Sequence, residues 1–242
     1  MKSYNDGAMG TVYAGTSGWA YTSWKRGFYP PTLASKDFLR HYASRLNSVE
    51  VNYTFRQLAS AETVREWADA TGASFRFAVK AHQTITHVKR LRDAAAITGE
   101  FFESIEPLRK AKKLGPVLFQ LPPNFKCDIA RLRAFLAELP KRLRVAFEFR
   151  HESWFVEEVY AALRKRGVAL CQAESEKIET PEVRTADFWY LRLRKPSYRP
   201  KDVAGRVQRL ARDGDVYVYF KHEDTPKSAW NAEALLPATK KK

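Results

Sequence analysis

Eight short apolar segments alternate along the chain with segments that have helical periodicity. The predicted strands span residues 12–19, 48–55, 75–82, 117–122, 144–150, 168–173, 188–194 and 215–222. The predicted helices span 36–46, a stretch beginning at residue 60, and 100–113, 128–139, 155–166, 202–212 and 227–236. Strands that alternate with helices are typical of parallel sheets, and eight such units predict a single (β/α)₈ TIM-type barrel.

The stretch RVAFEFRHESW, residues 144–154, shows the pattern most clearly. Strand side chains alternate between two faces, so Val145, Phe147 and Phe149 share one face, and Glu148 and Arg150 share the other. A large ionisable residue also recurs on the second face of the other strands. The pattern predicts apolar faces that pack on helices and an inward face whose carboxyl ends carry chemistry. We expect Glu148 and Arg150 to form a functional pair at a solvated barrel mouth.

Composition supports one domain. The chain has 242 residues, close to the usual barrel size of about 250, and 45% of them are hydrophobic. No linker rich in Gly, Pro or Ser interrupts it, so residues 12–238 are predicted to form the barrel, preceded by a loose leader over residues 1–11. The net charge of +15 favours anionic partners without specifying a fold.

Two cysteines, Cys127 and Cys171, form neither a disulfide framework nor a CxxC pair. The chain has no apolar run long enough to span a membrane, and its first ten residues lack the apolar core of a signal peptide. These features predict a reduced, cytoplasmic protein without a membrane partner. They leave the oligomeric state open.

Several long motifs resemble one known family. GTSGW, SVEVNYTF, FAVKAHQTITH, GPVLFQLPPNF, VAFEFRHESW and AWNAEALL occur in the order found in the YecE-like family, a "domain of unknown function" family. The resemblance covers about residues 13–236 and implies a TIM-type barrel. It implies no particular reaction, because the family has no settled chemistry.

The chain departs from the family pattern at three places. Arg56 replaces a Tyr after the second strand, Arg194–Lys195 replaces His-Gly, and Lys221–His222 replaces Asn-Asn. All three changes add positive charge to loops expected at the C-terminal face of the barrel. Family roles that depend on the replaced residues are therefore not carried over to this chain.

Polar residues at the carboxyl ends of the predicted strands should converge, as they do in barrel enzymes. We interpret them as a site for an anionic substrate, either phosphate-bearing or carboxylate. Glu148 and Glu50 would act as acid or base, and Tyr190 would orient a substrate oxygen. The substrate-binding candidates are Asn52, Lys80, Gln120, Arg150, Arg192 and Lys221, whose cations would clamp the anion. No cofactor is expected.

Two other interpretations of these residues stay open. The charges could form an internal ion-pair network with contacts such as Glu50–Lys80 and Glu148–Arg150. Alternatively, the ligands Glu50, His82, Glu148 and Glu174 could gather around a divalent metal, although no HxH or HExxH spacing supports this and the many cations oppose it. We therefore predict no metal site.

A non-catalytic nucleic-acid-binding module is the alternative from a different class. Residues 192–212 contain eight Lys or Arg and one acidic residue. Residues 24–29 add Trp24, Phe28 and Tyr29, either exposed for base stacking or packed as a plug. The basic run could equally be the solvated face of a helix. Ser17 lacks the context of a hydrolase nucleophile, and GTSG is too short for a phosphate loop.

Overall fold

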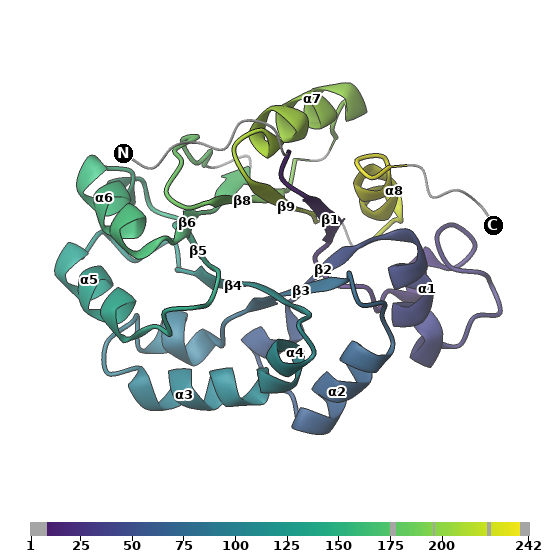
Figure 1. Ribbon diagram of the computed structural model, residues 1–242, viewed down its shortest axis with the longest axis horizontal. Coiled ribbons are helices and arrows are strands. Elements are labelled where there is room, and N and C mark those ends of the chain that lie inside the picture. Colours follow the sequence, from purple (N-terminus) through teal and green to yellow (C-terminus); the bar gives the residue numbers. More distant parts are fainter. Residues whose placement is uncertain (1–8, 175–177, 196, 222–223, 238–242) are drawn as a thin grey trace.

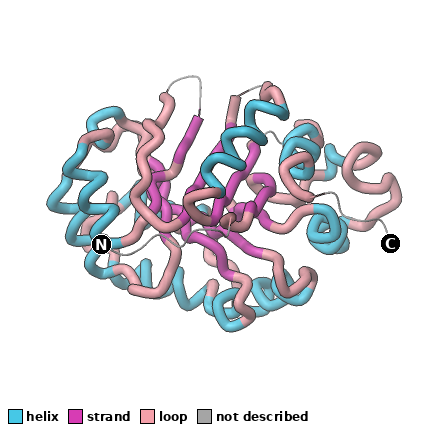
Figure 2. The backbone as a smooth tube through the Cα atoms, turned by 45° about the horizontal axis from the view of Figure 1, so that its top comes forward, coloured by secondary structure: helices cyan, strands magenta, loops and turns pink. Residues whose placement is uncertain are grey.

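The computed structural model describes residues 9–174, 178–195, 197–221 and 224–237. Parallel strands lie at the centre of the molecule and helices surround them, an α/β arrangement that is TIM-barrel-like (Figures 1 and 2). The strands are β1 (Val12–Thr16), β2 (Ser48–Val51), β3 (Arg76–Lys80), β4 (Leu114–Gln120), β5 (Val145–Glu148), β6 (Ala169–Leu170), β7 (Gln172–Glu174), β8 (Phe188–Leu193) and β9 (Asp215–Phe220).

These strands form two parallel sheets, ordered β1-β9-β8-β7 and β2-β3-β4-β5-β6. The sheets approach each other at two places. Ser17, just after β1, forms a parallel bridge with Glu50 of β2. On the other side, Cys171 alone separates β6 from β7, and its N–H donates to the carbonyl of Phe147 at 2.8 Å. The segment predicted as one strand over 168–173 is thus divided between the two sheets.

The helices are α1 (Phe38–Arg45), α2 (Ala61–Asp69), α3 (Ala95–Ser104), α4 (Glu106–Lys110), α5 (Ile129–Glu138), α6 (Glu157–Arg166), α7 (Pro200–Ala211) and α8 (Lys227–Glu233). Three predicted boundary residues are confirmed. Ser60 and Asp128 accept hydrogen bonds from the N–H groups of Thr63 and Arg131 and cap α2 and α5. Gly167 ends α6 in the left-handed conformation, with φ of 67°.

The helix predicted over residues 100–113 is wrong in its bounds. It is two helices, α3 and α4, which meet at Ile105. Pro107 has no N–H to donate to the carbonyl of Glu103, so the first helix cannot continue. The preceding connection is also more ordered than predicted, because a π-helix spans Thr84–Val88 and α3 already begins at Ala95. Similarly, β2 ends at Val51, and Tyr53–Phe55 form a 3₁₀ turn.

The alternation of strand side chains produces two separate apolar clusters. Val145, Phe147 and Phe149 pack in the larger cluster, between strands and helices. The smaller cluster lies on the opposite face of the strands and combines small residues with large aromatic ones: Ala78, Leu118, Ala146, Ala169, Cys171, Ala173, Phe188, Tyr190, Tyr217 and Tyr219. The two-faced strand pattern predicted from RVAFEFR is confirmed.

The aromatic loop after β1 is a plug. Trp24, Phe28 and Tyr29 are each at most 2% exposed, and the Tyr29 ring stacks on Phe38 of α1. Among the described residues both cysteines are free thiols. No helix in the described ranges has the length and apolar character needed to cross a membrane.

Candidate functional site

Arg192, near the carboxyl end of β8, is the centre of a buried charge cluster. Its side chain is 2% exposed, and it bridges two carboxylates that are also buried. One guanidinium nitrogen lies 2.6 Å from Oε1 of Glu50, and the other lies 2.5 Å from Oε2 of Glu148. Strands β2, β5 and β8 are thereby joined at one end. We call Glu50, Lys80, Glu148, Arg150, Tyr190, Arg192 and Arg194 the strand-end site.

Glu50 accepts hydrogen bonds from groups on several strands. The hydroxyl groups of Ser17 and Tyr190 donate to it at 2.8 and 2.7 Å, and the amide of Asn52 donates at 3.3 Å. Burial would raise the pKa of Glu50, but the charge and hydrogen bonds of Arg192 outweigh that effect, so the pKa is lowered. The carboxylate is therefore ionised and fully engaged.

Glu148 is in contact with three guanidinium groups. Besides Arg192, Nε of Arg150 donates to Oε1 at 2.8 Å, and a nitrogen of Arg194 lies 3.6 Å from the same oxygen. Burial would raise the pKa of this carboxyl as well, and the charges of Arg192 and Arg150 lower it instead. The predicted meeting of Glu148 and Arg150 is confirmed. The expectation of a solvated pair is wrong for Glu148, which is 1% exposed, whereas the Arg150 side chain is 28% exposed.

Lys80, the last residue of β3, differs from the other charged groups of the site. It is 8% exposed, and its Nζ lies 3.8 Å from the centre of the Phe55 ring. Burial and the charge of Arg192 lower the pKa of Lys80 from 10.5 to about 7, against the opposing influence of Glu148 and Glu50. The Phe55 ring favours the ammonium form of Lys80, so it also opposes the lowering of the pKa. Near neutral pH both the amine and the ammonium form are available.

His87, on the π-helix, extends the site toward solvent. Its ring packs edge-on against Phe55, with centroids 5.0 Å apart, and it shares a hydrogen bond of 2.8 Å with the Thr86 hydroxyl. Burial, followed by the charges of Lys80 and Arg150, lowers the pKa of His87. His87 was not among the residues predicted from the sequence, although π-helical turns often occur at functional sites.

Comparison with known proteins places the chain in a family. Residues 13–242 match the model described as "Protein of unknown function DUF72". The chain belongs to the DUF72 family. It is 33% identical over 156 residues to the UPF0759 protein YunF of Bacillus subtilis (strain 168), an alignment that includes 62% of this chain and 54% of YunF. The chain spans about half the length of this curated relative.

Two crystal structures of DUF72 family proteins share the fold. The one from Thermotoga maritima MSB8 is 28% identical, with a TM-score of 0.81, covering 93% of this chain and 97% of that one. The one from Enterococcus faecalis V583 is 22% identical, with a TM-score of 0.74, covering 93% and 96%. These similarities support the fold.

The DUF72 fold brings most of the predicted site residues together. Gln120 is buried, and its Oε1 accepts a hydrogen bond from Arg192 at 3.5 Å. Lys221 follows β9, and its N–H donates to the carbonyl of Leu193 at 3.0 Å, next to Arg192 and Arg194 in the chain, while its side chain is exposed. Arg194 is a member of the strand-end site that was not predicted, and Ser17, Phe55 and His87 lie around the site and were not predicted either. Ser17 and Arg194 lie one residue beyond β1 and β8, so their position at strand ends was the available signal.

The ion-pair interpretation is partly realised. Glu148 does pair with Arg150, but Glu50 pairs with Arg192 rather than with Lys80. The metal interpretation finds no support in the described residues, where no group of three or more His, Cys, Asp or Glu side chains is placed to hold an ion. Glu174 is directed elsewhere and forms an ion pair with Arg206.

The two segments proposed for nucleic-acid binding, residues 24–29 and 192–212, are only partly available to a ligand. The aromatic residues of the plug are buried and cannot stack on bases. In the basic run, Arg192 is internal, while Arg206 and Arg209 both form ion pairs with Glu182, Arg209 at 2.7 Å. His222, which the sequence placed at the end of the last predicted strand, lies outside the described residues. Arg192, Arg206 and Arg209 are thus engaged with carboxylates, whereas Arg199, Lys201 and Arg212 are exposed.

Proposed function

We propose that this DUF72 protein is an enzyme that carries out acid–base chemistry on a small anionic substrate at the strand-end site. The observation that carries the proposal is Lys80: a buried amine with a pKa of about 7, surrounded by permanently charged groups. A general base works best when its pKa lies near the working pH. Shifted pKa values of this kind are common at active sites.

Excess positive charge supports an anionic substrate. The site holds two carboxylates, Glu50 and Glu148, against four basic side chains, Lys80, Arg150, Arg192 and Arg194. Nε of Arg194 is buried and has no hydrogen-bond acceptor among the described residues. Arg150 is partly exposed and has donors left after pairing with Glu148. Carboxylate or phosphate oxygens are the acceptors that match such groups.

We assign roles that differ from those expected from the sequence. Glu50 and Glu148 are ionised and hold Arg192, so they position the site rather than exchange protons. Tyr190 donates to Glu50, and burial and the charge of Glu50 raise its pKa well above the usual value, so it stays protonated. Lys80 accepts the proton, and Arg150 and Arg194 bind the anionic group.

Two measurements test the proposal. In D₂O, a panel of small carboxylates and sugar phosphates is incubated with the protein, and NMR detects deuterium incorporation next to the anionic or carbonyl group. We expect incorporation into at least one compound, lost in Lys80→Met and kept in Lys89→Met, an exposed lysine of the same connection. Exchange that is equal in both variants, or no exchange with any compound, would contradict the proposal.

Binding is measured separately by thermal unfolding. At about 100 times its Kd, a ligand adds about 2.7 kcal/mol, which is a rise in Tm of about 5 °C or more for a chain of this size. Malonate should produce such a rise in the parent and in Arg92→Met, an exposed control. In Arg150→Met the rise should shrink by more than half. An identical rise in both variants would remove Arg150 from the substrate site.

Finer features of the fold belong to the same proposal. We infer that the two sheets form one closed wall of eight strands, with β6 and β7 counted as one, because the Ser17–Glu50 bridge and the Cys171 hydrogen bond lie where the sheets meet. The YecE-like assignment within the family and a cytoplasmic location remain predictions from the sequence.

A further inference from the structure

A second basic site lies at the opposite end of the strands. A cavity of about 630 Å³ is lined by the six basic residues Lys141, Arg142, Arg144, Arg164, Arg166 and Arg184. We call it the N-terminal cavity, because Arg144, Gly167 and Asp187, which also line it, come just before β5, β6 and β8. The strand-end site is at the carboxyl ends of these strands, so the two sites are separate.

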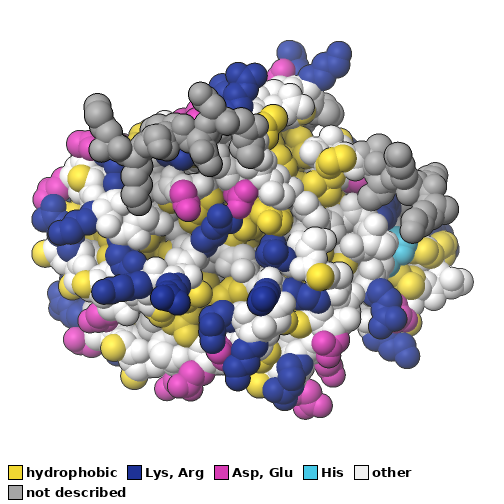
Figure 3. All heavy atoms as spheres, viewed as in Figure 1, with side chains coloured by type: hydrophobic (Ala, Val, Ile, Leu, Met, Phe, Trp, Pro, Cys, Tyr) yellow, Lys and Arg dark blue, Asp and Glu magenta, His cyan; other side chains and the backbone are white. Residues whose placement is uncertain are grey.

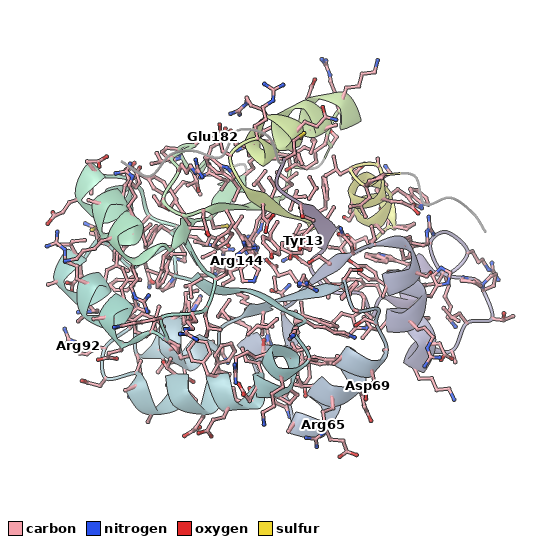
Figure 4. All side chains as sticks on the ribbon, in the orientation of Figure 1. Tyr13, Arg65, Asp69, Arg92, Arg144 and Glu182 are labelled. Carbon is pink, nitrogen blue, oxygen red and sulfur yellow. The ribbon has the colours of Figure 1, made fainter. Side chains whose placement is uncertain are left out.

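Arg144 reaches the inner face of the strands, where Phe188 and Tyr217 lie. In Figure 4 both Arg144 and Tyr13 lie toward the centre of the molecule. Its guanidinium donates to Asp215 at 2.6 Å and to the Tyr217 hydroxyl at 2.9 Å, and it lies 5.3 Å from the centre of the Phe188 ring. Its side chain is still 37% exposed. Arg144 is therefore fixed in direction while remaining open to a ligand.

Other guanidinium groups are held by backbone carbonyls. Arg166 donates to the carbonyls of Leu136 and Leu139, beside the end of α5. Arg184 donates to the carbonyls of Ala186 and Asp213, and Arg164 donates to the carbonyl of Arg184. Carbonyl acceptors orient a guanidinium but do not cancel its charge, so Arg166 contributes a positive charge that is fixed in direction.

The charge balance favours an anion. Against six basic residues, the lining contributes one carboxylate, Asp187. Two further carboxylates pair with lining residues from outside, Asp215 with Arg144 and Glu157 with Arg164. With Arg184 left out of the count, five basic residues face these three carboxylates, and positive charge is still in excess. Figure 3 shows Lys and Arg side chains repeated across the centre and lower part of the face in view.

We propose that the N-terminal cavity binds a free, phosphate-bearing small molecule with more than one phosphate group. Guanidinium forks match phosphate oxygens in pairs. The volume is within the range of ligand pockets and much larger than one phosphate ion requires. The inference is independent of the proposed function, because no residue is shared between the two sites.

The test is calorimetric titration with tripolyphosphate at constant ionic strength. The double variant Lys141→Glu/Arg142→Glu changes two exposed residues of the cavity. The matched control Lys36→Glu/Arg40→Glu makes the same change in net charge at two exposed positions near and on α1. We expect one tripolyphosphate per chain in the parent and at least a tenfold weaker Kd in the cavity variant. The control should stay within about twofold.

Two further arms keep the outcome decisive. Arg150→Met alters the strand-end site only, so it should keep the full tripolyphosphate affinity. A single-stranded oligothymidine of equal phosphate concentration tests whether a nucleic-acid backbone is the actual ligand. Equal weakening in cavity variant and control, or oligothymidine binding without tripolyphosphate binding, would overturn the proposal. Circular dichroism and an unchanged Tm without ligand confirm that the variants are folded.

Discussion

At the residue scale, the arrangement around Arg192 explains why two buried carboxylates are tolerated. A buried ion is expensive to desolvate, and it persists only when it is paired and hydrogen-bonded. Glu50 and Glu148 each have one oxygen within 2.6 Å of Arg192, with further donors beside it. Burial lowers and the two carboxylates raise the pKa of Arg192, and the net result is a rise. This residue is a permanent cation.

The first prediction concerns the removal of one carboxylate charge. Glu148→Gln leaves three guanidinium groups near an uncharged side chain in a buried place, so the free energy of unfolding should fall by about 3–5 kcal/mol. The control Glu158→Gln breaks an exposed ion pair with Arg133. It should change the free energy of unfolding by no more than about 1 kcal/mol. Urea unfolding measures both. A Glu148→Gln loss as small as the control would show that the cluster does not stabilise the fold.

The second prediction concerns Lys80 and pH. The folded chain lowers its pKa to about 7, against the ordinary 10.5. Between those values the unfolded chain binds more protons, so the contribution of Lys80 to the free energy of unfolding rises with pH from about 7 to 10.5. Lys80→Met removes that dependence. Below pH 7 it should be more stable than the parent by about 3–5 kcal/mol, and the difference should vanish near pH 10.5.

Urea unfolding at several pH values, with Lys89→Met as the exposed control, measures the effect. The control should follow the parent at every pH. A constant difference between Lys80→Met and the parent would mean that Lys80 does not change its protonation in this range.

At the element scale, the sequence determines much of the fold through local rules. Strand alternation identified the inward residues, and capping residues placed the starts of α2 and α5. The sequence could not show that the strand predicted over 168–173 would be divided between two sheets at Cys171. That division depends on a backbone hydrogen bond from Cys171 to Phe147 of another strand. The π-helix over Thr84–Val88 likewise has no simple periodic signature, and with it the position of His87 was missed.

The third prediction uses two glycines that have open space around them. Gly167 has φ of 67° at the end of α6, whereas Gly205 lies within the helical α7, and a Cβ atom would meet nothing within 4 Å at either. Gly167→Ala should therefore lower the free energy of unfolding by about 1 kcal/mol, through backbone conformation alone. Gly205→Ala should raise it by about 0.5–1 kcal/mol. Chemical unfolding of both variants measures the difference, and effects of the same sign would contradict the assignment of the two conformations.

At the scale of the whole molecule, the net charge of +15 is not spread evenly. Part of the basic run at 192–212 is internal or paired with acidic residues. Positive charge remains in excess at the two ends of the strands, in the strand-end site and in the N-terminal cavity. The sequence showed the total charge and the inward faces, but long-range pairing decided which cations kept capacity for a ligand. The burial of the plug likewise depends on contacts of Phe28 and Tyr29 with α1, which are distant in the sequence from the sheet.

The central claim is that the strand-end site binds an anion and moves a proton through Lys80. An anion bound beside Lys80 raises its pKa from about 7, so binding at pH 7.5 should be accompanied by proton uptake. Calorimetric titration of malonate in two buffers with different ionisation enthalpies measures the number of protons taken up. We predict an uptake of roughly half a proton per anion in the parent, none in Lys80→Met, and greatly weakened binding in Arg150→Met. Binding without proton uptake in the parent, or uptake that persists in Lys80→Met, would contradict the account.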